Sequence, residues 1–174
     1  MNSLSLSMQI ETERLVIKDI SSSEAAFYLK LFNDPDWIRN ISDKGLKTVE
    51  EVEEYIENKV LKEFQVNGNG FFTIRTKDHM KPIGVSTLLF RDNTSFYDVG
   101  YGLMPDARGK GYAKEATLAM MAYAENTFGI PKIYAITKLD NEPSIGLLQS
   151  LGFSLKEQST IFGEELNNIF EYQY

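Results

Sequence analysis

The chain has 174 residues, of which 43% are hydrophobic and 12% aromatic, and this is enough for one domain with a sizeable core over residues 1–174. Its formal net charge of −7 argues against nucleic-acid binding, because phosphate contacts need clustered cations, and the lack of cysteine excludes disulfides, thiolate metal sites and a cysteine nucleophile. No apolar run approaches the ~20 residues of a membrane span, and the N-terminus has no leader pattern, so we expect a soluble, cytoplasmic protein.

The first part of the chain predicts one strand and two helices. Residues 14–20 (RLVIKDI) alternate apolar and polar side chains, as a half-buried strand does. Serines at 21–23 offer N-caps for a helix that runs to about residue 32 and ends at the Asn-Asp-Pro of residues 33–35. Thr48 and Glu51 form a capping box for a second helix, which ends near Asn67-Gly68. The apolar stripe of that second helix is Val49, Val52, Ile56, Val60 and Phe64.

Three strand-like segments follow, and polar turn clusters separate them. They are residues 71–76, 83–90 and 96–103, and they predict an antiparallel meander. The only histidine, His79, lies in the first turn cluster. Because the sequence offers this lone histidine no complete catalytic triad or metal-ligand set, we interpret it as a turn residue. No metal site is expected, although residue counts leave a purely carboxylate site open.

The remainder predicts a long helix, a strand, a short helix and two closing strands. The long helix begins at Tyr112 and ends at Gly129, whose missing Cβ suits a C-cap. A strand over residues 132–138 precedes a short helix over residues 144–151, and the two closing strands flank the FGEEL turn at residues 162–166. The order predicts an α+β (mixed α/β) domain with about seven strands and about four helices.

The segment RGKGYA, residues 108–113, joins a predicted strand to the long helix. A helix N-terminus presents unpaired N–H groups and about half a positive charge, and Gly109 and Gly111 let an anion approach the backbone. It is not a P-loop, because Gly111 stands where one needs Ser or Thr. It is not a dinucleotide fingerprint either, because Lys114 replaces the third glycine. The segment predicts a pyrophosphate site of another kind.

The segment matches [RQ]-x-x-G-x-[GA], spelled here by Arg108, Gly111 and Ala113, and so resembles the signature of the GNAT superfamily of N-acetyltransferases. Residues 139–153 (LDNEPSIGLLQSLGF) resemble that family's N-x-x-S helix. Residues 11–20 (ETERLVIKDI) resemble the first strand of its ribosomal-protein N-terminal, RimJ/RimL-like, branch. The resemblance implies a single domain with a mostly antiparallel mixed sheet whose middle strands splay.

The resemblance also implies acetyl-CoA as cosubstrate and no metal. Backbone N–H groups of the glycine-rich segment would bind the pyrophosphate, the pantetheine arm would lie along the end of the strand before it, and the N–H of Leu103 would polarise the thioester carbonyl. Asn141 would hold the pantetheine or thiol arm. The residues assigned to the cofactor are Leu103, Met104, Arg108, Gly109, Lys110, Gly111, Tyr112, Ala113 and Asn141.

Gly100 and Gly102 lie within the strand that ends at Leu103. Glycines inside a strand often mark a close backbone approach, here by the cofactor, and this interpretation is favoured over relief of crowding beside Tyr97 and Tyr101.

The catalytic assignments start from the acceptor amine, which must lose a proton before it attacks. Asp98 occupies the place where relatives often carry a glutamate, and it is equally well a general base or a simple carboxylate at a strand start. Many relatives use a tyrosine seven residues after the asparagine as the acid, but Leu148 stands there. Ser144 is therefore the proton donor that the resemblance implies, although both Asn141 and Ser144 also suit plain helix capping.

We expect the acceptor pocket to come from residues 33–47. Trp37 is interpreted as a packing residue, and Arg39 could face a carboxylate or peptide group. The predicted function is acetyl transfer to a primary amine by direct attack in a ternary complex. The acceptor is left open between a protein N-terminus and a small polyamine, aminoglycoside or amino-acid-like amine, and the net charge mildly favours cationic acceptors. The alternative is a non-catalytic acyl-CoA-binding or sensing module. Neither nucleic acid nor membrane is an expected partner, and the protein is a monomer or homodimer.

Overall fold

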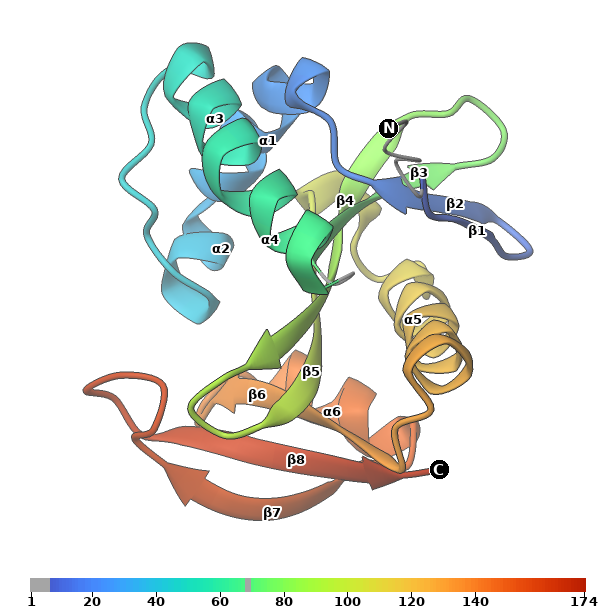
Figure 1. Ribbon diagram of the computed structural model, residues 1–174, viewed down its shortest axis with the longest axis vertical. Coiled ribbons are helices and arrows are strands. Elements are labelled where there is room, and N and C mark those ends of the chain that lie inside the picture. The colour runs from blue at the N-terminus through green and yellow to red at the C-terminus, as the bar shows by residue number, and fades with distance from the viewer. Residues whose placement is uncertain (1–6, 68–69) are drawn as a thin grey trace.

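A computed structural model describes residues 7–67 and 70–174, and these residues form one mixed sheet of eight strands in the order β1-β2-β3-β4-β5-β6-β8-β7 (Figure 1). Neighbouring strands of this sheet are antiparallel except β5 and β6, which are parallel. The predicted mixed α+β domain is confirmed. The strands are β1 (Gln9–Glu11), β2 (Leu15–Asp19), β3 (Gly70–Thr76), β4 (Pro82–Arg91), β5 (Phe96–Leu103), β6 (Lys132–Lys138), β7 (Ser154–Ser159) and β8 (Asn167–Gln173).

Helices cover both faces of the sheet (Figure 1). Those of the first half pack on one face, while α5 and α6 pack on the other. A π-helical turn over residues 56–60 joins α3 to α4, so the two continue one another. The helices are α1 (Ala25–Phe32), α2 (Pro35–Asn40), α3 (Val49–Tyr55), α4 (Leu61–Asn67), α5 (Tyr112–Phe128) and α6 (Glu142–Ser150).

The local sequence explains where the helices begin. Both predicted N-terminal signals form complete capping boxes, Ser21 with Glu24 and Thr48 with Glu51. The segment after α1 was predicted as a joint without a helix, and this is wrong. Pro35 begins α2, because proline suits the first helical position, and the Asp34 carboxylate caps the helix by accepting from the Trp37 N–H at 3.2 Å.

Two cores form because strand side chains alternate between the faces of the sheet. In β3, Phe72 and Ile74 join the core under α5. Phe71 and Thr73 face the helices of the first half, where the Thr73 hydroxyl lies 2.8 Å from the buried phenol oxygen of Tyr28. The sheet is thereby held from both sides, and the helices α2 and α5 reach its middle strands from opposite faces.

The middle of the sheet splays as predicted. Strands β5 and β6 are in register at one position, Asp98 opposite Tyr134, whereas β4 and β5 pair along their whole length. Beyond that point the edge of β5 is left without a strand partner, and the N-termini of α5 and α6 lie beside it. The gap in the ladder is where the functional site is built.

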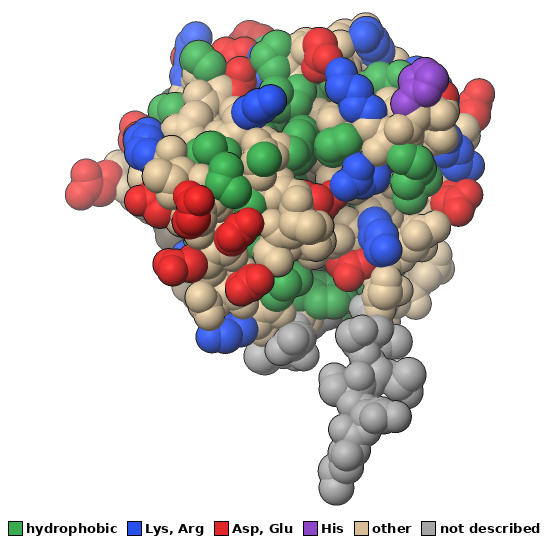
Figure 2. Space-filling model, turned by 90° about the horizontal axis from the view of Figure 1, so that it is seen from above, with side chains coloured by type: hydrophobic (Ala, Val, Ile, Leu, Met, Phe, Trp, Pro, Cys, Tyr) green, Lys and Arg blue, Asp and Glu red, His purple; other side chains and the backbone are tan. Residues whose placement is uncertain are grey.

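Figure 2 views the molecule onto the end that carries α3 and the turn between β3 and β4. Acidic side chains gather on the α3 side, where residues 50, 51, 53, 54 and 57 are exposed opposite a buried apolar stripe. His79 lies in the β3–β4 turn with its side chain exposed, as predicted. Within the described ranges, no helix is long and apolar enough to cross a membrane, and His, Asp and Glu side chains form no group of three suited to a metal.

Candidate active site

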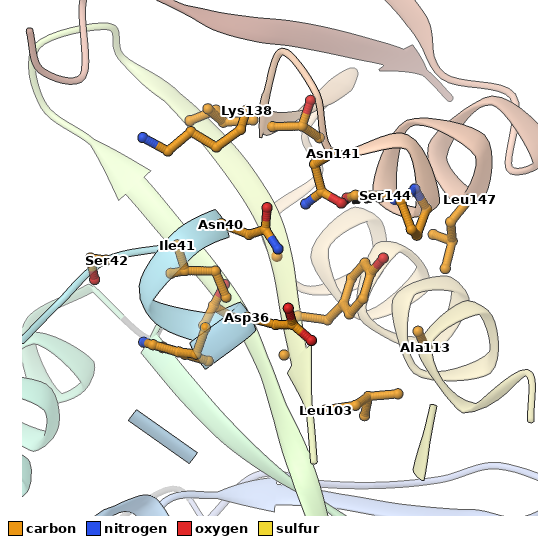
Figure 3. A pocket seen from close by; sticks show the side chains of 18 of the residues that line it. Asp36, Asn40, Ile41, Ser42, Leu103, Ala113, Lys138, Asn141, Ser144 and Leu147 are labelled. Carbon is orange, nitrogen blue, oxygen red and sulfur yellow. Dashed lines mark hydrogen bonds between the residues drawn. The ribbon is translucent and has the colours of Figure 1, made fainter. Parts of the chain in front are cut away.

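A cavity of about 980 Å³ occupies the gap between β5 and β6. Helix α2 forms one wall, and the N-termini of α5 and α6 form the other (Figure 3). Most of the residues predicted for the cofactor and for catalysis therefore share one cavity, although they are far apart in sequence. Those that line it are Asp98, Leu103, Arg108, Gly109, Gly111, Tyr112, Ala113, Asn141 and Ser144.

The hydrogen-bond pattern of β5 directs the Leu103 N–H into this cavity. The Met104 N–H donates to the Ile83 carbonyl at 2.9 Å, and backbone groups in an antiparallel ladder alternate between one neighbour and the other. The N–H of Leu103 must then point to the opposite side, toward the unpaired edge that faces β6. A free N–H beside a cavity can polarise a carbonyl group placed there.

Met104 and Lys110 do not line the cavity, unlike the other residues assigned to the cofactor. Both backbone groups of Met104 are used internally, since its carbonyl also accepts from the Ala107 N–H at 3.0 Å. The Lys110 ammonium turns away and donates to the Asp106 carbonyl at 2.7 Å. The side chains of Met104 and Lys110 thus lie outside the cavity lining.

The glycine-rich turn has the backbone geometry of an anion site. Gly109 and Gly111 adopt φ values of 72° and 82°, in the left-handed region where a side chain is strained. Gly111 is the N-cap of α5 and supplies no side chain to the first turn, so the N–H groups of Tyr112 and Ala113 have no capping side chain. Those donors and the positive end of a 17-residue helix converge at one side of the cavity.

A half-buried carboxylate, that of Glu115, holds this turn from the side away from the cavity. Glu115 accepts hydrogen bonds from the Thr12 hydroxyl at 2.6 Å and from the Arg14 backbone N–H at 2.8 Å, and its other oxygen accepts from Arg14 Nε at 2.7 Å. Arg14 also donates to the Lys110 carbonyl at 2.8 Å. Burial alone would raise the pKa of Glu115, but the bonds from Thr12 and Arg14 outweigh it and hold that pKa below its ordinary value. The segment before β2 thus positions the turn.

Arg108 lines the cavity, but its guanidinium also binds groups of the chain itself. Its guanidinium donates to the Leu103 carbonyl, from Nε at 3.1 Å and from Nη2 at 2.9 Å, and it pairs with Asp34 at 2.6 Å and with Asp36. The side chain therefore ties the end of β5 to the N-terminus of α2. It thereby holds two walls of the cavity together.

The glycines of β5 make room for neighbouring side chains. A Cβ on Gly102 would lie 2.4 Å from Cζ3 of Trp37, and one on Gly100 would lie 2.7 Å from the Thr87 hydroxyl. Gly100 and Gly102 therefore do relieve crowding, but the neighbouring side chains are Thr87 and Trp37 and not Tyr97 and Tyr101. Trp37 is 4% exposed and packs α2 onto the sheet, as predicted.

Asp98 lies at the closed end of the cavity and is 4% exposed. Its carboxylate accepts from Arg91 Nε at 2.5 Å and from Nη2 at 3.4 Å. Burial raises the pKa of Asp98 above its ordinary value, and the hydrogen bond and charge of Arg91 oppose that rise. Asp98 is therefore a carboxyl group at the cavity wall that is held in place by its cation.

Asn141 and Ser144 line the cavity from the first turn of α6 (Figure 3). The capping interpretation holds for Asn141, whose side-chain oxygen accepts from the Ser144 backbone N–H at 3.4 Å. The Ser144 hydroxyl has a different neighbour, the phenol of Tyr101. Burial raises the pKa of Tyr101, and the serine hydroxyl opposes this. Sequence reasoning missed Tyr101, which lies on β5 beside Leu103 and places a second hydroxyl in the cavity.

The geometry describes an acyl-group site, with an anion-binding helix N-terminus, a free strand-edge N–H and hydroxyl groups around one cavity. Residues 14–154 match the Acetyltransferase (GNAT) domain family. The chain belongs to this family and is an acyltransferase enzyme. Members use acetyl-CoA and acetylate an amine. An uncharacterized N-acetyltransferase of Bacillus subtilis, YoaA, is 24% identical over 146 residues, which are 83% of this chain and 81% of that relative.

Solved structures share the fold. The RimL ribosomal L7/L12 alpha-N-protein acetyltransferase, in complex with coenzyme A, superposes with a TM-score of 0.82 at 15% identity, over 95% of this chain and 98% of that one. The ribosomal-protein-S5-alanine acetyltransferase of Vibrio fischeri superposes with a TM-score of 0.77 at 21% identity, over 95% and 96% of the two chains. At such identities the likeness establishes the fold.

Proposed function

We propose that this protein transfers the acetyl group of acetyl-CoA to the N-terminal amine of a protein or peptide, by direct attack in a ternary complex. The observation that carries the proposal is the single cavity that joins the α5 N-terminus to the unpaired edge of β5, with α2 as the opposite wall. A peptide-like acceptor is supported by the fold that this chain shares with the RimL and S5-alanine acetyltransferases. The proposal places the chain in the RimJ/RimL-like branch.

The glycine-rich turn fits a pyrophosphate. The backbone N–H groups of Gly109, Gly111, Tyr112 and Ala113 would hold it, and the helix N-terminus favours its negative charge. Acetyl-CoA, when bound, supplies an activated acetyl thioester. The Asn141 amide faces the cavity from α6 and would hold the pantetheine arm against the edge of β5.

The remaining groups have roles in the transfer itself. The Leu103 N–H would stabilise negative charge on the carbonyl oxygen as the amine attacks. The Ser144 hydroxyl, which lies next to the Tyr101 phenol, would donate a proton to the departing thiolate. Asp98 would accept the proton of the amine, and its raised pKa favours that task. A carboxylate becomes a stronger base as the pKa of its carboxyl group rises.

The test is a panel of amines with acetyl-CoA, in which free CoA and acetylated product are measured together. Release above the buffer rate with peptides would support the proposal. Stabilisation by acetyl-CoA without release for any amine would favour the acyl-CoA-binding module instead.

The cofactor assignment is tested separately by the substitution Gly111→Glu. It places bulk and negative charge against the pyrophosphate, so we expect acetyl-CoA binding to be lost in calorimetry. Gly129→Glu is the matched control, because Gly129 ends the same helix in the same left-handed region, with φ of 60°, and an added Cβ there meets nothing within 4 Å. Unchanged affinity of the Gly111 variant would refute the assignment of this turn.

A further inference from the structure

The loop between α2 and α3 places a lysine ammonium among aromatic rings. Lys44 Nζ lies 5.2 Å from the ring centroid of Tyr55, 5.5 Å from that of Phe32 and 5.7 Å from that of Phe71. Lys44 lines the active-site cavity. Burial lowers its pKa, and the positive charge of Lys59 lowers it further. The rings hold a cation in the cavity wall at a distance from the cofactor turn.

This ammonium has no anionic partner in the described part of the chain. None of the hydrogen bonds or ion pairs formed there involves Lys44, and the nearby carboxylate that acts on it, Glu63, does so only through its field. Trp37, which lines the same cavity and stacks near Phe32 at 5.2 Å, has a buried indole N–H that is likewise without an acceptor. Buried donors are normally satisfied, so the buried indole N–H of Trp37, in the same cavity as the half-buried Lys44 ammonium, points to an acceptor from outside the chain.

An anion would pair with an ammonium and accept from an N–H donor, whereas a cation can do neither. An acceptor with a second ammonium would be repelled by the charge of Lys44, and the three rings would only partly offset that repulsion. The local charge at this end of the cavity is therefore positive, although the net charge of the chain is negative. Local charge decides binding here, because the net charge acts mainly on long-range steering.

The register of the sheet sets how far the anion lies from the reacting amine. Phe71, beneath the Lys44 ammonium, is opposite Thr87 on β4, and Thr87 is opposite Gly100 on β5. Two inter-strand spacings separate Phe71 from β5, or roughly 10 Å. A free α-amino acid, with its amine and carboxylate on one carbon, is too short to reach both places. The acceptor must carry its anion several bonds from its amine.

We infer that Lys44, with the Trp37 indole N–H, is a specificity-determining site for an anionic group on the acceptor, several bonds from the amine that is acetylated. The inference rests on the proposed function. It selects among amines the class that carries a distant carboxylate or phosphate, namely a peptide with an acidic or phosphorylated side chain near its N-terminus. It disfavours polyamines and aminoglycosides.

The experiment measures kcat and KM with pairs of acceptors that differ only in the anion. One arm compares peptides with Glu or Gln at the second and third positions, and the other compares peptides with phosphoserine or serine at these positions. We expect the anionic member of at least one pair to have a KM about tenfold lower. Which arm responds distinguishes a carboxylate from a phosphate. Equal KM values in both arms, with acetyl transfer still observed, would overturn the inference but leave the proposed function intact.

Variants assign the preference to named groups. Lys44→Gln should reduce the preference to less than about twofold, and Trp37→Phe, which removes the N–H but keeps the aromatic bulk, should reduce it in part. Lys59→Gln is the matched control, since Lys59 also lies over Tyr55, at 5.7 Å, but outside the cavity lining. A preference that survives in the Lys44 variant, or is lost equally in the Lys59 variant, contradicts the assignment. Thermal unfolding of each variant checks that the fold is retained.

Discussion

The close contact between Gly102 and Trp37 allows a sharp test of how α2 is seated. In Gly102→Ala, the new Cβ would lie 2.4 Å from Cζ3 and 2.7 Å from Cε3 of Trp37, whereas carbon atoms in contact prefer about 3.5–4.0 Å. The indole must therefore shift by about 1 Å. It is buried and packed against Phe32, so the shift must be shared with α2. Overpacking of this kind costs about 1–3 kcal/mol of the free energy of unfolding.

Urea denaturation measures that cost, and acceptor KM measures the displacement of the cavity wall. For a chain of this size a loss of 1 kcal/mol lowers Tm by roughly 2–4 °C. Gly146→Ala is the control, because Gly146 lies within α6, where an added Cβ meets nothing within 4 Å and alanine should raise the free energy of unfolding by about 0.5–1 kcal/mol. The same chemical change should thus have opposite signs at the two positions. A Gly102→Ala variant as stable as the wild type would refute the reasoning.

Two further predictions concern Glu115 and Ser144. Because Glu115 has a depressed pKa in the folded state, its stabilisation is present above its unfolded pKa of about 4.3 and is lost as pH falls through the folded value. Glu115→Gln should therefore lower the free energy of unfolding by about 1 kcal/mol at pH 7, and the gap to the wild type should close in acid. A gap that does not depend on pH would contradict this. Ser144→Ala keeps the backbone N–H that Asn141 caps, so stability and acetyl-CoA affinity should hold while kcat falls about 100-fold. Parallel losses of stability and kcat would indicate a structural role instead.

The sequence was sufficient for features that local residue patterns determine. Capping boxes at Ser21 and Thr48, alternation in the strands, and the glycines that open and close α5 each act within a few residues, and the elements they predict are present. The short strand β1 was missed because three residues carry too little periodicity, and its formation depends on pairing with β2. The helix α2 was missed because Pro35 was interpreted only as the end of one helix, although it also begins the next.

The candidate site could be predicted where function depends on the backbone, and not where it depends on pairing between distant residues. The glycine-rich turn is recognisable from spacing alone. Arg108 was assigned to the cofactor, but its guanidinium pairs with Asp34 and Asp36, which lie more than 70 positions away and which no local pattern reveals. The roles of Glu115 and Tyr101 in the site were missed for the same reason, because those roles depend on the side chains that the fold brings next to them.

The two ends of α2 are held with different strength, and this difference locates where acceptor specificity can vary. At its N-terminus, Asp34 is 9% exposed and bonds to Arg108, which also holds the end of β5, so this end is fixed to the cofactor side. At its C-terminus, Arg39 pairs with Asp140 at 2.9 Å, but both side chains are 68% exposed, and such pairs contribute little. Under the proposed function, substitution of Arg39 should therefore alter the acceptor end of α2 while the cofactor end keeps its geometry. Lys44 lies further along, where three aromatic rings surround its ammonium, so its substitution should change acceptor preference without freeing α2.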